Sequence, residues 1–178
     1  MACNVVSGIT YNCLNNTGGL LAIYITNFEG QTGVTFDSTN FITAVEMSGT
    51  YLYNEFKFNR DTSTLDEKAS VSLPNGTTFY TQTVTLKIPR RDAAKRNKIL
   101  ALADGQPKLS IIVQDFNQEY WLVGFLNGAY LTGNDSPSGT KKGDENGYTL
   151  TFVAEEPELA YGIDPAVISA IILPASQE

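Results

Sequence analysis

Short apolar runs separated by turn-forming residues fill most of the chain, and this pattern predicts strands rather than helices. The run at 20–26 is almost entirely apolar and follows a loop at 15–19. Such a run is typical of a strand that is covered on both faces. Two weaker strands are predicted at 33–36 and 41–47.

A long β-hairpin is predicted between residues 51 and 88. Its first arm, 51–58, alternates between apolar and polar side chains, and its return arm, 78–88, alternates more cleanly. One face of the return arm is rich in hydroxyl groups and suits a solvated sheet surface, because it carries Thr81, Thr83 and Thr85. The polar segment 59–76 lies between the arms, and we expect it to extend the strands or to form a flexible flap.

One helix is predicted at about 92–104, where Asp92 is a suitable N-cap and Gly105 suits the position after the helix. Its expected apolar stripe consists of Ile99, Leu100 and Ala103.

The C-terminal half is predicted to be β again, with strands at 108–116, 119–126 and 148–153. The segment 129–132 is expected to extend the second of these strands or to follow a bulge near Gly128. A loop of 15 residues, 133–147, interrupts these strands, and a loop of that length is usually functional or mobile. The apolar run 166–173 is expected to be an arm that packs on a neighbouring subunit, or the last strand or helix of the same core.

These elements together predict an all-β or β-dominated α+β domain with one helix inserted between sheet halves. With 178 residues, the chain has the length of one domain. We expect a single structural domain over 1–178, with an N-terminal arm at 1–19, a β core at 20–153 and a C-terminal arm at 154–178.

Composition excludes several kinds of chemistry. The chain has no histidine, which excludes Ser-His-Asp and Cys-His catalysis and His-ligated zinc. Its net charge of −7 opposes the holding of nucleic acid by phosphate neutralisation, although nucleic acid could slide past an acidic surface. No glycine-rich phosphate loop or nucleophile motif is present, so we expect no enzyme, no metal site and no cofactor.

The cysteines, Cys3 and Cys13, are too few for a four-ligand zinc site. We expect two reduced thiols, or a disulfide that ties down the N-terminal loop. No apolar run is long enough to predict a membrane span, and the N-terminus lacks the features of a signal peptide. The expected compartment is therefore the cytosol, or a particle assembled there.

Half of the basic residues, six of twelve, lie in one short run: Lys87, Arg90, Arg91, Lys95, Arg96 and Lys98. The run is expected to be a solvated helix face, or a positive face that meets an acidic face on the next copy. A nucleic-acid patch is poorly supported, because no aromatic residues interleave with the run.

An acidic cluster and a set of aromatic residues are two further candidate sites. The acidic residues at 144–145 and 155–158 could be paired catalytic carboxylates or a calcium site, but their composition favours turns and surface charge. Several aromatic side chains could stack sugars or bases, but alternation along strands favours packing: Tyr120, Trp121, Tyr130, Tyr148 and Phe152.

A combined pattern runs along most of the chain: Met1-Ala2-Cys3, Cys13, Gly18-Gly19-Leu20, 75–80 (NGTTFY), 120–124 (YWLVG) and 142–152 (KGDENGYTLTF). It resembles a family of small structural proteins of tailed bacteriophages, especially those infecting Bacteroidetes hosts. The likeness covers about residues 1–165, and within the virion it is greatest to tail tube proteins.

The resemblance implies a tail-tube-like fold: a β-sandwich or partial barrel with a long β-hairpin and one flanking helix. It also implies self-assembly into hexameric rings that stack into a tube, which conducts DNA during ejection. The expected location is the virion tail, assembled in the bacterial host cytoplasm. The expected partners are further copies of the chain, other tail or head proteins and, transiently, genomic DNA, with no membrane.

Under this hypothesis the lumen-facing candidates are Thr81, Thr83 and Thr85. The candidates for contacts between rings or subunits are Asp135, Ser136, Lys141, Lys142, Asp144, Arg90, Arg91 and Arg96. The alternatives are a capsid decoration, auxiliary or head–tail joining protein, and a carbohydrate-binding β-sandwich module of a virion fibre.

Overall fold

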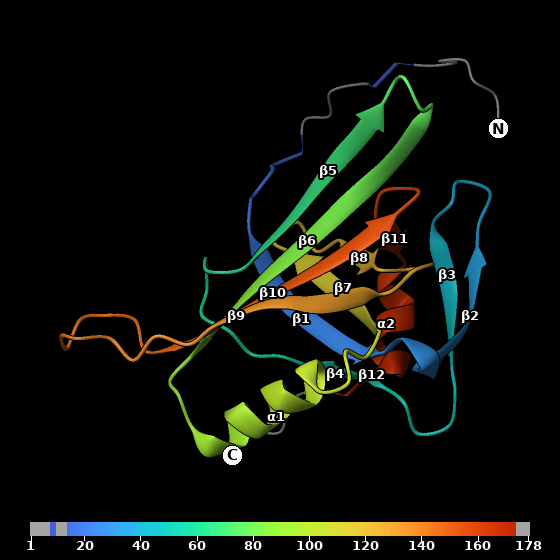
Figure 1. Ribbon diagram of the computed structural model, residues 1–178. Coiled ribbons are helices and arrows are strands. Elements are labelled where there is room, and N and C mark those ends of the chain that lie inside the picture. The colour runs from blue at the N-terminus through green and yellow to red at the C-terminus, as the bar shows by residue number, and fades with distance from the viewer. Residues whose placement is uncertain (1–7, 10–13, 174–178) are drawn as a thin grey trace.

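Twelve strands and two helices account for most of the chain in the computed structural model, which describes residues 8–9 and 14–173. The strands belong to one mixed sheet that turns back on itself, so that two layers pack face to face (Figure 1). This architecture confirms the predicted mainly β fold with a flanking helix.

Four long antiparallel strands form one layer, which we call the four-stranded layer. Their spatial order is β9 (Ala129–Asp135), β10 (Gly147–Glu156), β6 (Thr77–Pro89) and β5 (Thr64–Ser72). The β5–β6 hairpin extends well beyond the other strands at the top of Figure 1.

The other eight strands form the second layer. Their spatial order is β2 (Gln31–Phe36), β3 (Ile42–Met47), β11 (Tyr161–Ile163), β8 (Tyr120–Val123), β7 (Leu109–Asp115), β1 (Leu20–Asn27), β4 (Tyr53–Glu55) and β12 (Ile172–Leu173). The pairing of Leu109 in β7 with Ala129 in β9 links this layer to the four-stranded layer.

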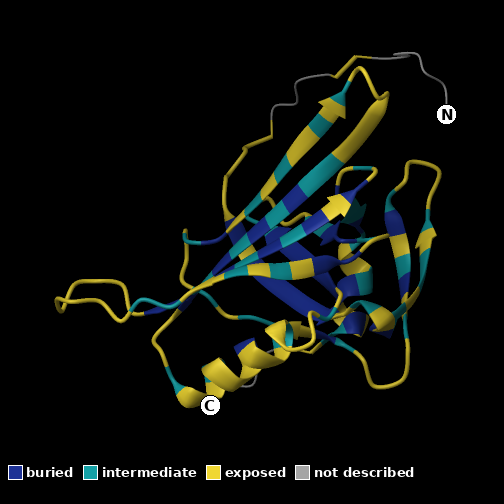
Figure 2. Ribbon diagram, viewed as in Figure 1, coloured by how far each residue is buried: buried dark blue, intermediate teal, exposed yellow. Residues whose placement is uncertain are grey.

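The main core lies between the two layers, and a second core lies on the far side of the eight-stranded layer (Figure 2). Strand β1 supplies both cores: Ile23 and Ile25 enter the first, whereas Ala22 and Tyr24 enter the second. The prediction of a strand covered on both faces is therefore confirmed.

The predicted helix is α1 (Ala93–Ala103), and its start is confirmed because the Asp92 side chain accepts a hydrogen bond of 2.7 Å from the Lys95 amide. The predicted apolar stripe is partly wrong. Ile99 is buried, but Leu100 is 46% exposed and Leu102 packs against the core instead. Helix α1 therefore lies at the edge of the fold, with most of its side chains in solvent (Figure 2).

The hairpin prediction is correct for the return arm and wrong for the first arm. Strand β6 pairs with β5, which comes from the polar segment 59–76, along nine residue pairs. The expected arm at 51–58 instead supplies β4, which pairs with β1. Tyr53 draws this segment into the second core, because its hydroxyl is satisfied there by Gln31 and Ser110.

At the C-terminal side the structure confirms one of the two alternatives for the run 166–173 and corrects the expected extension of the second strand. The run 166–173 forms α2 (Pro165–Ile171) and β12, and Ile168 and Ile171 are buried, so it belongs to the same core and is not an arm on a neighbour. The segment 129–132 is not an extension of β8. Gly124 has a φ of +74°, and a Cβ there would lie 2.7 Å from the amide nitrogen of Ala129, so a tight turn redirects the chain into the other layer.

Candidate functional site

The outer face of the four-stranded layer carries small hydroxyl side chains. Along β6, Val84 and Leu86 point into the core and are fully buried, so Thr81, Thr83 and Thr85 point to the opposite side. Strand register places Thr151 of β10 beside Thr85, and Thr64 of β5 on its other side. We call this surface the threonine face; its outer rows also contain Asp66, Lys68 and Glu155.

Both lateral edges of the four-stranded layer are open among the described residues. Strand β5 pairs with β6 alone, and β9 pairs with β10 and, through Ala129, with β7. Backbone groups on these two edges can therefore pair with strands of another chain.

A loop at 136–146, which we call the projecting loop, extends from the body of the molecule at the left of Figure 1. The carboxylate of Asp144 organises its tip by accepting hydrogen bonds of 2.8 Å from the amides of Thr140 and Lys141. These bonds lower the pKa of Asp144. The loop is shorter than predicted because β9 continues to Asp135, whereas Ser136, Lys141 and Lys142 lie in the loop as expected.

The base of the projecting loop meets the basic run at one end of the four-stranded layer. Asn146 accepts hydrogen bonds from the amide of Arg90 through its carbonyl oxygen, at 2.8 Å, and from the amide of Arg91 through Oδ1, at 3.1 Å. Lys95 Nζ donates to the carbonyl oxygens of Pro89 and Arg90, at 2.7 and 3.1 Å. We call the exposed turn of Arg90 and Arg91 the basic corner.

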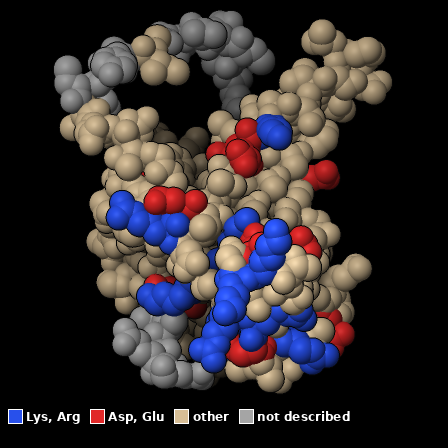
Figure 3. All heavy atoms as spheres, turned by 90° about the vertical axis from the view of Figure 1, so that its left-hand side faces the viewer, with Lys and Arg blue, Asp and Glu red and all other residues tan. Residues whose placement is uncertain are grey.

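Basic side chains gather over the end of the molecule that carries α1 and the basic corner, whereas the β5–β6 hairpin above carries few charges (Figure 3). Arg96 lies on the exposed surface of α1, and its guanidinium donates to Asn97. The structure thus brings the candidate contact residues of the loop and of the basic run to the same end.

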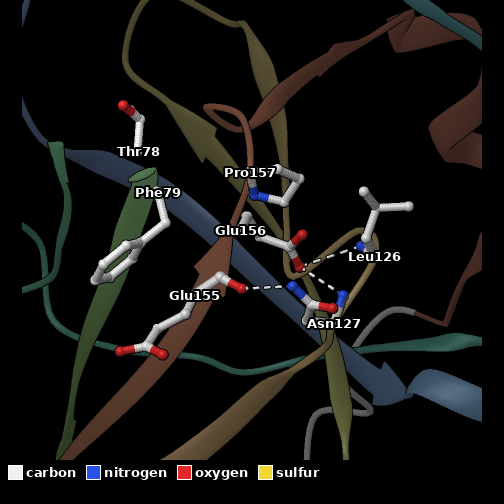
Figure 4. Close-up of a pocket in the computed structure, with 7 residues that line it drawn as sticks. All are labelled: Thr78, Phe79, Leu126, Asn127, Glu155, Glu156 and Pro157. Atoms are coloured by element: carbon white, nitrogen blue, oxygen red, sulfur yellow. Dashed lines mark hydrogen bonds between the residues drawn. The ribbon is translucent and has the colours of Figure 1, made fainter. Parts of the chain in front are cut away.

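A shallow hollow of about 420 Å³ lies at the opposite end of the same strands (Figure 4). Its lining includes Phe79, Leu126 and Pro157 and two glutamates, Glu155 and Glu156. We call it the acidic hollow.

Glu156 is 3% exposed, and its Oε1 accepts hydrogen bonds from the amides of Leu126 and Asn127, at 3.1 and 2.8 Å (Figure 4). Burial raises the pKa of this carboxyl, while the backbone hydrogen bonds act in the opposite direction. Glu155 lies on the other side of the strand, and its carbonyl oxygen accepts a hydrogen bond of 2.7 Å from the Asn127 side chain.

The acidic hollow is a feature that the sequence reasoning missed, because the glutamates were assigned to turns and surface charge. One signal was available: alternation along β10 places Glu156 on the same face as Phe152 and Ala154, which is the buried face. The expected acidic cluster itself is not formed, because Asp144 and Glu145 lie at one end of β10 and Glu155 and Glu156 at the other.

The aromatic residues do not form a common platform. Tyr148 and Phe152 are buried in the first core, whereas Trp121 packs beside it and donates from Nε1 to Asp115 at 3.4 Å. Packing, as predicted, is therefore the role of these three side chains and of Tyr120 in the second core, whereas Tyr130 is 36% exposed and belongs to neither core.

Three other expectations concern the cysteines, a metal site and a membrane span. Cys3 and Cys13 lie outside the described residues. Within the described part of the chain, no group of three acidic or cysteine side chains is arranged to hold a metal ion. Neither described helix has the length and apolar character needed to cross a membrane.

No protein-family model matches this chain. No curated protein matches it either.

Proposed function

We propose that this chain is a virion structural protein of a tailed phage, and that it forms the tail tube as stacked rings of six copies. The observation that carries the proposal is the four-stranded layer, which combines two open edges with a half-buried hydroxyl face. When β5 of one copy pairs with β9 of the next, the contact is head-to-tail, and a head-to-tail contact closes into a ring when its rotation allows.

The dimensions of such a ring suit a conduit. Six copies would contribute 24 strands, spaced roughly 4.8 Å apart and tilted by about 40°, to one continuous barrel. These values give roughly 50 Å between opposite backbones, which leaves a wide lumen after side chains are added. Closure would also remove the open sheet edges, which otherwise favour aggregation.

The threonine face would line this lumen. Its small, uncharged hydroxyl groups dominate, and Asp66, Lys68, Lys87 and Glu155 add charges of both signs. A surface without a positive patch attracts phosphates weakly, so DNA would pass without being held. The projecting loop would contact the next ring, together with other tail or head proteins where the tube ends.

Negative-stain electron microscopy of the purified chain over a concentration series tests the proposal. We expect rings and hollow tubes of uniform width. Small particles of one size at every concentration would contradict tube formation and would favour a decoration or head–tail joining protein, which binds a preformed head. Glycan binding by the isolated chain would favour the carbohydrate-binding alternative.

A further inference from the structure

The two ends of the four-stranded layer carry opposite charge. Residues 87–98 contain six basic side chains and one acidic side chain, so this segment carries +5 and the remaining residues carry −12. At the other end, residues 155–159 contain three glutamates and no basic residue. The acidic hollow and the basic corner are therefore electrostatically complementary.

Strand β6 connects these two sites directly. It begins beside the acidic hollow, where Thr78 and Phe79 form part of the wall, and it ends at Pro89, next to the basic corner. Thirteen residues at ~3.3 Å each separate the two ends by roughly 40 Å. If a second copy is shifted along the strand direction by the length of β6, its basic corner lies against the acidic hollow of the first copy.

The hollow suits a long basic side chain. Phe79 and Leu126 are 40% and 51% exposed, so the hollow offers apolar surface to the methylene groups of an arginine or lysine. The side chain of Glu155 is exposed at this end, and the buried side chain of Glu156 also belongs to the lining. Apolar walls with carboxylates favour a basic side chain over an acidic or a purely apolar one.

The basic corner is built to present such a side chain. Arg90 is exposed and its φ is +60°, a conformation that the hydrogen bond to Asn146 helps to hold. Arg91 lies 6.0 Å from the ring centre of Tyr148, which ties that guanidinium to the fold. The side chain of Arg90 is exposed, so it is accessible to a second molecule.

We propose that a second copy of this chain occupies the acidic hollow, and that Arg90 of that copy enters it and pairs with Glu155. The inference rests on the proposed function and deepens it by naming the contact that joins one ring to the next. The contact is heterologous, and repetition along the strand direction leaves it open, so it generates a filament rather than a closed dimer.

Charge reversal tests the contact in the purified full-length chain. We expect Arg90→Glu and Glu155→Arg each to raise the critical concentration for tube formation by at least about tenfold, while rings still form. Combining the two substitutions restores the ion pair with opposite polarity, and we expect it to restore tubes. Arg60→Glu is the matched control, because it makes the same change of charge at a highly exposed residue that belongs to neither the acidic hollow nor the basic corner.

Sedimentation velocity separates rings from tubes, and thermal unfolding verifies that each variant is folded. Tubes that form normally in both single variants would overturn the inference and leave the proposed function standing. Loss of tubes in both single variants without rescue in the double variant would overturn the pairing of these two residues. A wild-type chain that forms neither rings nor tubes would overturn both proposals.

Discussion

At the scale of single residues, Glu156 shows how one buried carboxylate fastens two segments of the chain. Its two backbone hydrogen bonds hold the turn between β8 and β9 against the end of β10. Because burial raises its pKa above the ordinary value of 4.5, the folded protein binds this proton more tightly than the unfolded chain does. Its contribution to stability is therefore fully present below pH 4.5 and is lost as the pH rises through the folded pKa.

Glu156→Gln tests this linkage, since the amide oxygen can accept the same hydrogen bonds without a charge. We expect the variant to gain stability relative to wild type as the pH rises from about 4 to 7, with the gain complete above the folded pKa. Urea unfolding of both proteins across this pH range measures the difference in their free energies of unfolding. The other carboxyl groups are the same in both proteins, so their contributions to the pH dependence cancel in this difference. A difference that does not change with pH would contradict the prediction.

Tyr53 is a second buried residue whose polar atom forms hydrogen bonds inside the core. The side chain is fully buried, its hydroxyl lies 2.8 Å from Ser110 Oγ, and it donates to Gln31 Oε1 at 2.9 Å. We expect Tyr53→Phe to lower the free energy of unfolding by about 1 kcal/mol, because Ser110 still donates to Gln31. Tyr51→Phe is the control, since Tyr51 is 42% exposed, and urea unfolding should show no change there. Equal losses in the two variants would contradict the role of the buried hydroxyl.

At the scale of elements, the sequence predicts those parts whose local signals agree with their surroundings. The strand β1 and the start of α1 are such cases. A continuous apolar run predicts that β1 is buried on both faces, and Asp92 directly before the helix predicts its N-cap. Strand β5 is not such a case, because its residues are mostly polar and its partner lies across a turn. Pairing with β6 determines the position of β5 in the sheet. In this pairing Thr64 and Asp66 lie beside Thr85 and Thr83 and continue the outer rows of the threonine face.

Local pattern predicts the burial of Glu156 along β10, but it does not predict the hollow around it. Phe79 and Leu126 come from segments that are distant in sequence, and the turn at Gly124 brings the β8–β9 connection beside β10. The pairing of strands that are distant in the sequence determines which residues meet at the hollow. The pattern of a single sequence carries little information about such pairing. The candidate lumen and loop residues were easier to place, because each set lies within one strand or one loop.

The projecting loop makes a prediction at this scale. Deletion of 140–144 removes Lys141, Lys142 and Asp144 but keeps the bond from the Gly147 amide to the Pro137 carbonyl oxygen at the loop base. We expect the variant to unfold at the same temperature as wild type within a few degrees and to form shorter tubes, because contacts to the next ring are lost. Electron microscopy and thermal unfolding measure the two effects.

A control for this deletion separates loop length from loop chemistry. Replacement of 140–144 by five residues of glycine and serine keeps the length but removes the charges and the bonds of Asp144. Tubes of normal length in both variants would show that the loop makes no stacking contact. A large fall in unfolding temperature would instead assign the loop a role in folding.

At the scale of the whole molecule, the proposed functions divide among directions of the same four-stranded layer. Its open edges, β5 and β9, lie across the strands and would close the ring, whereas the acidic hollow and the basic corner lie along the strands and would stack the rings. The third direction, perpendicular to the sheet, has the threonine face on one side and the main core on the other. Lateral closure can therefore be altered separately from stacking by substitution, whereas Glu155 belongs to both the threonine face and the acidic hollow.

Thr85→Lys tests the conduit without disturbing either contact. The cross-strand neighbours of Thr85 are Thr64 and Thr151, so no carboxylate lies directly opposite to neutralise the new charge. Six lysines per ring would line the lumen and attract phosphates, so we expect tubes that assemble normally but retain short duplex DNA at low salt. Co-sedimentation of DNA with purified tubes measures retention, which should fall steeply as salt is added, and Thr85→Gln is the control of similar length without charge. Variant tubes that retain no more DNA than the glutamine control would show that Thr85 does not face the lumen.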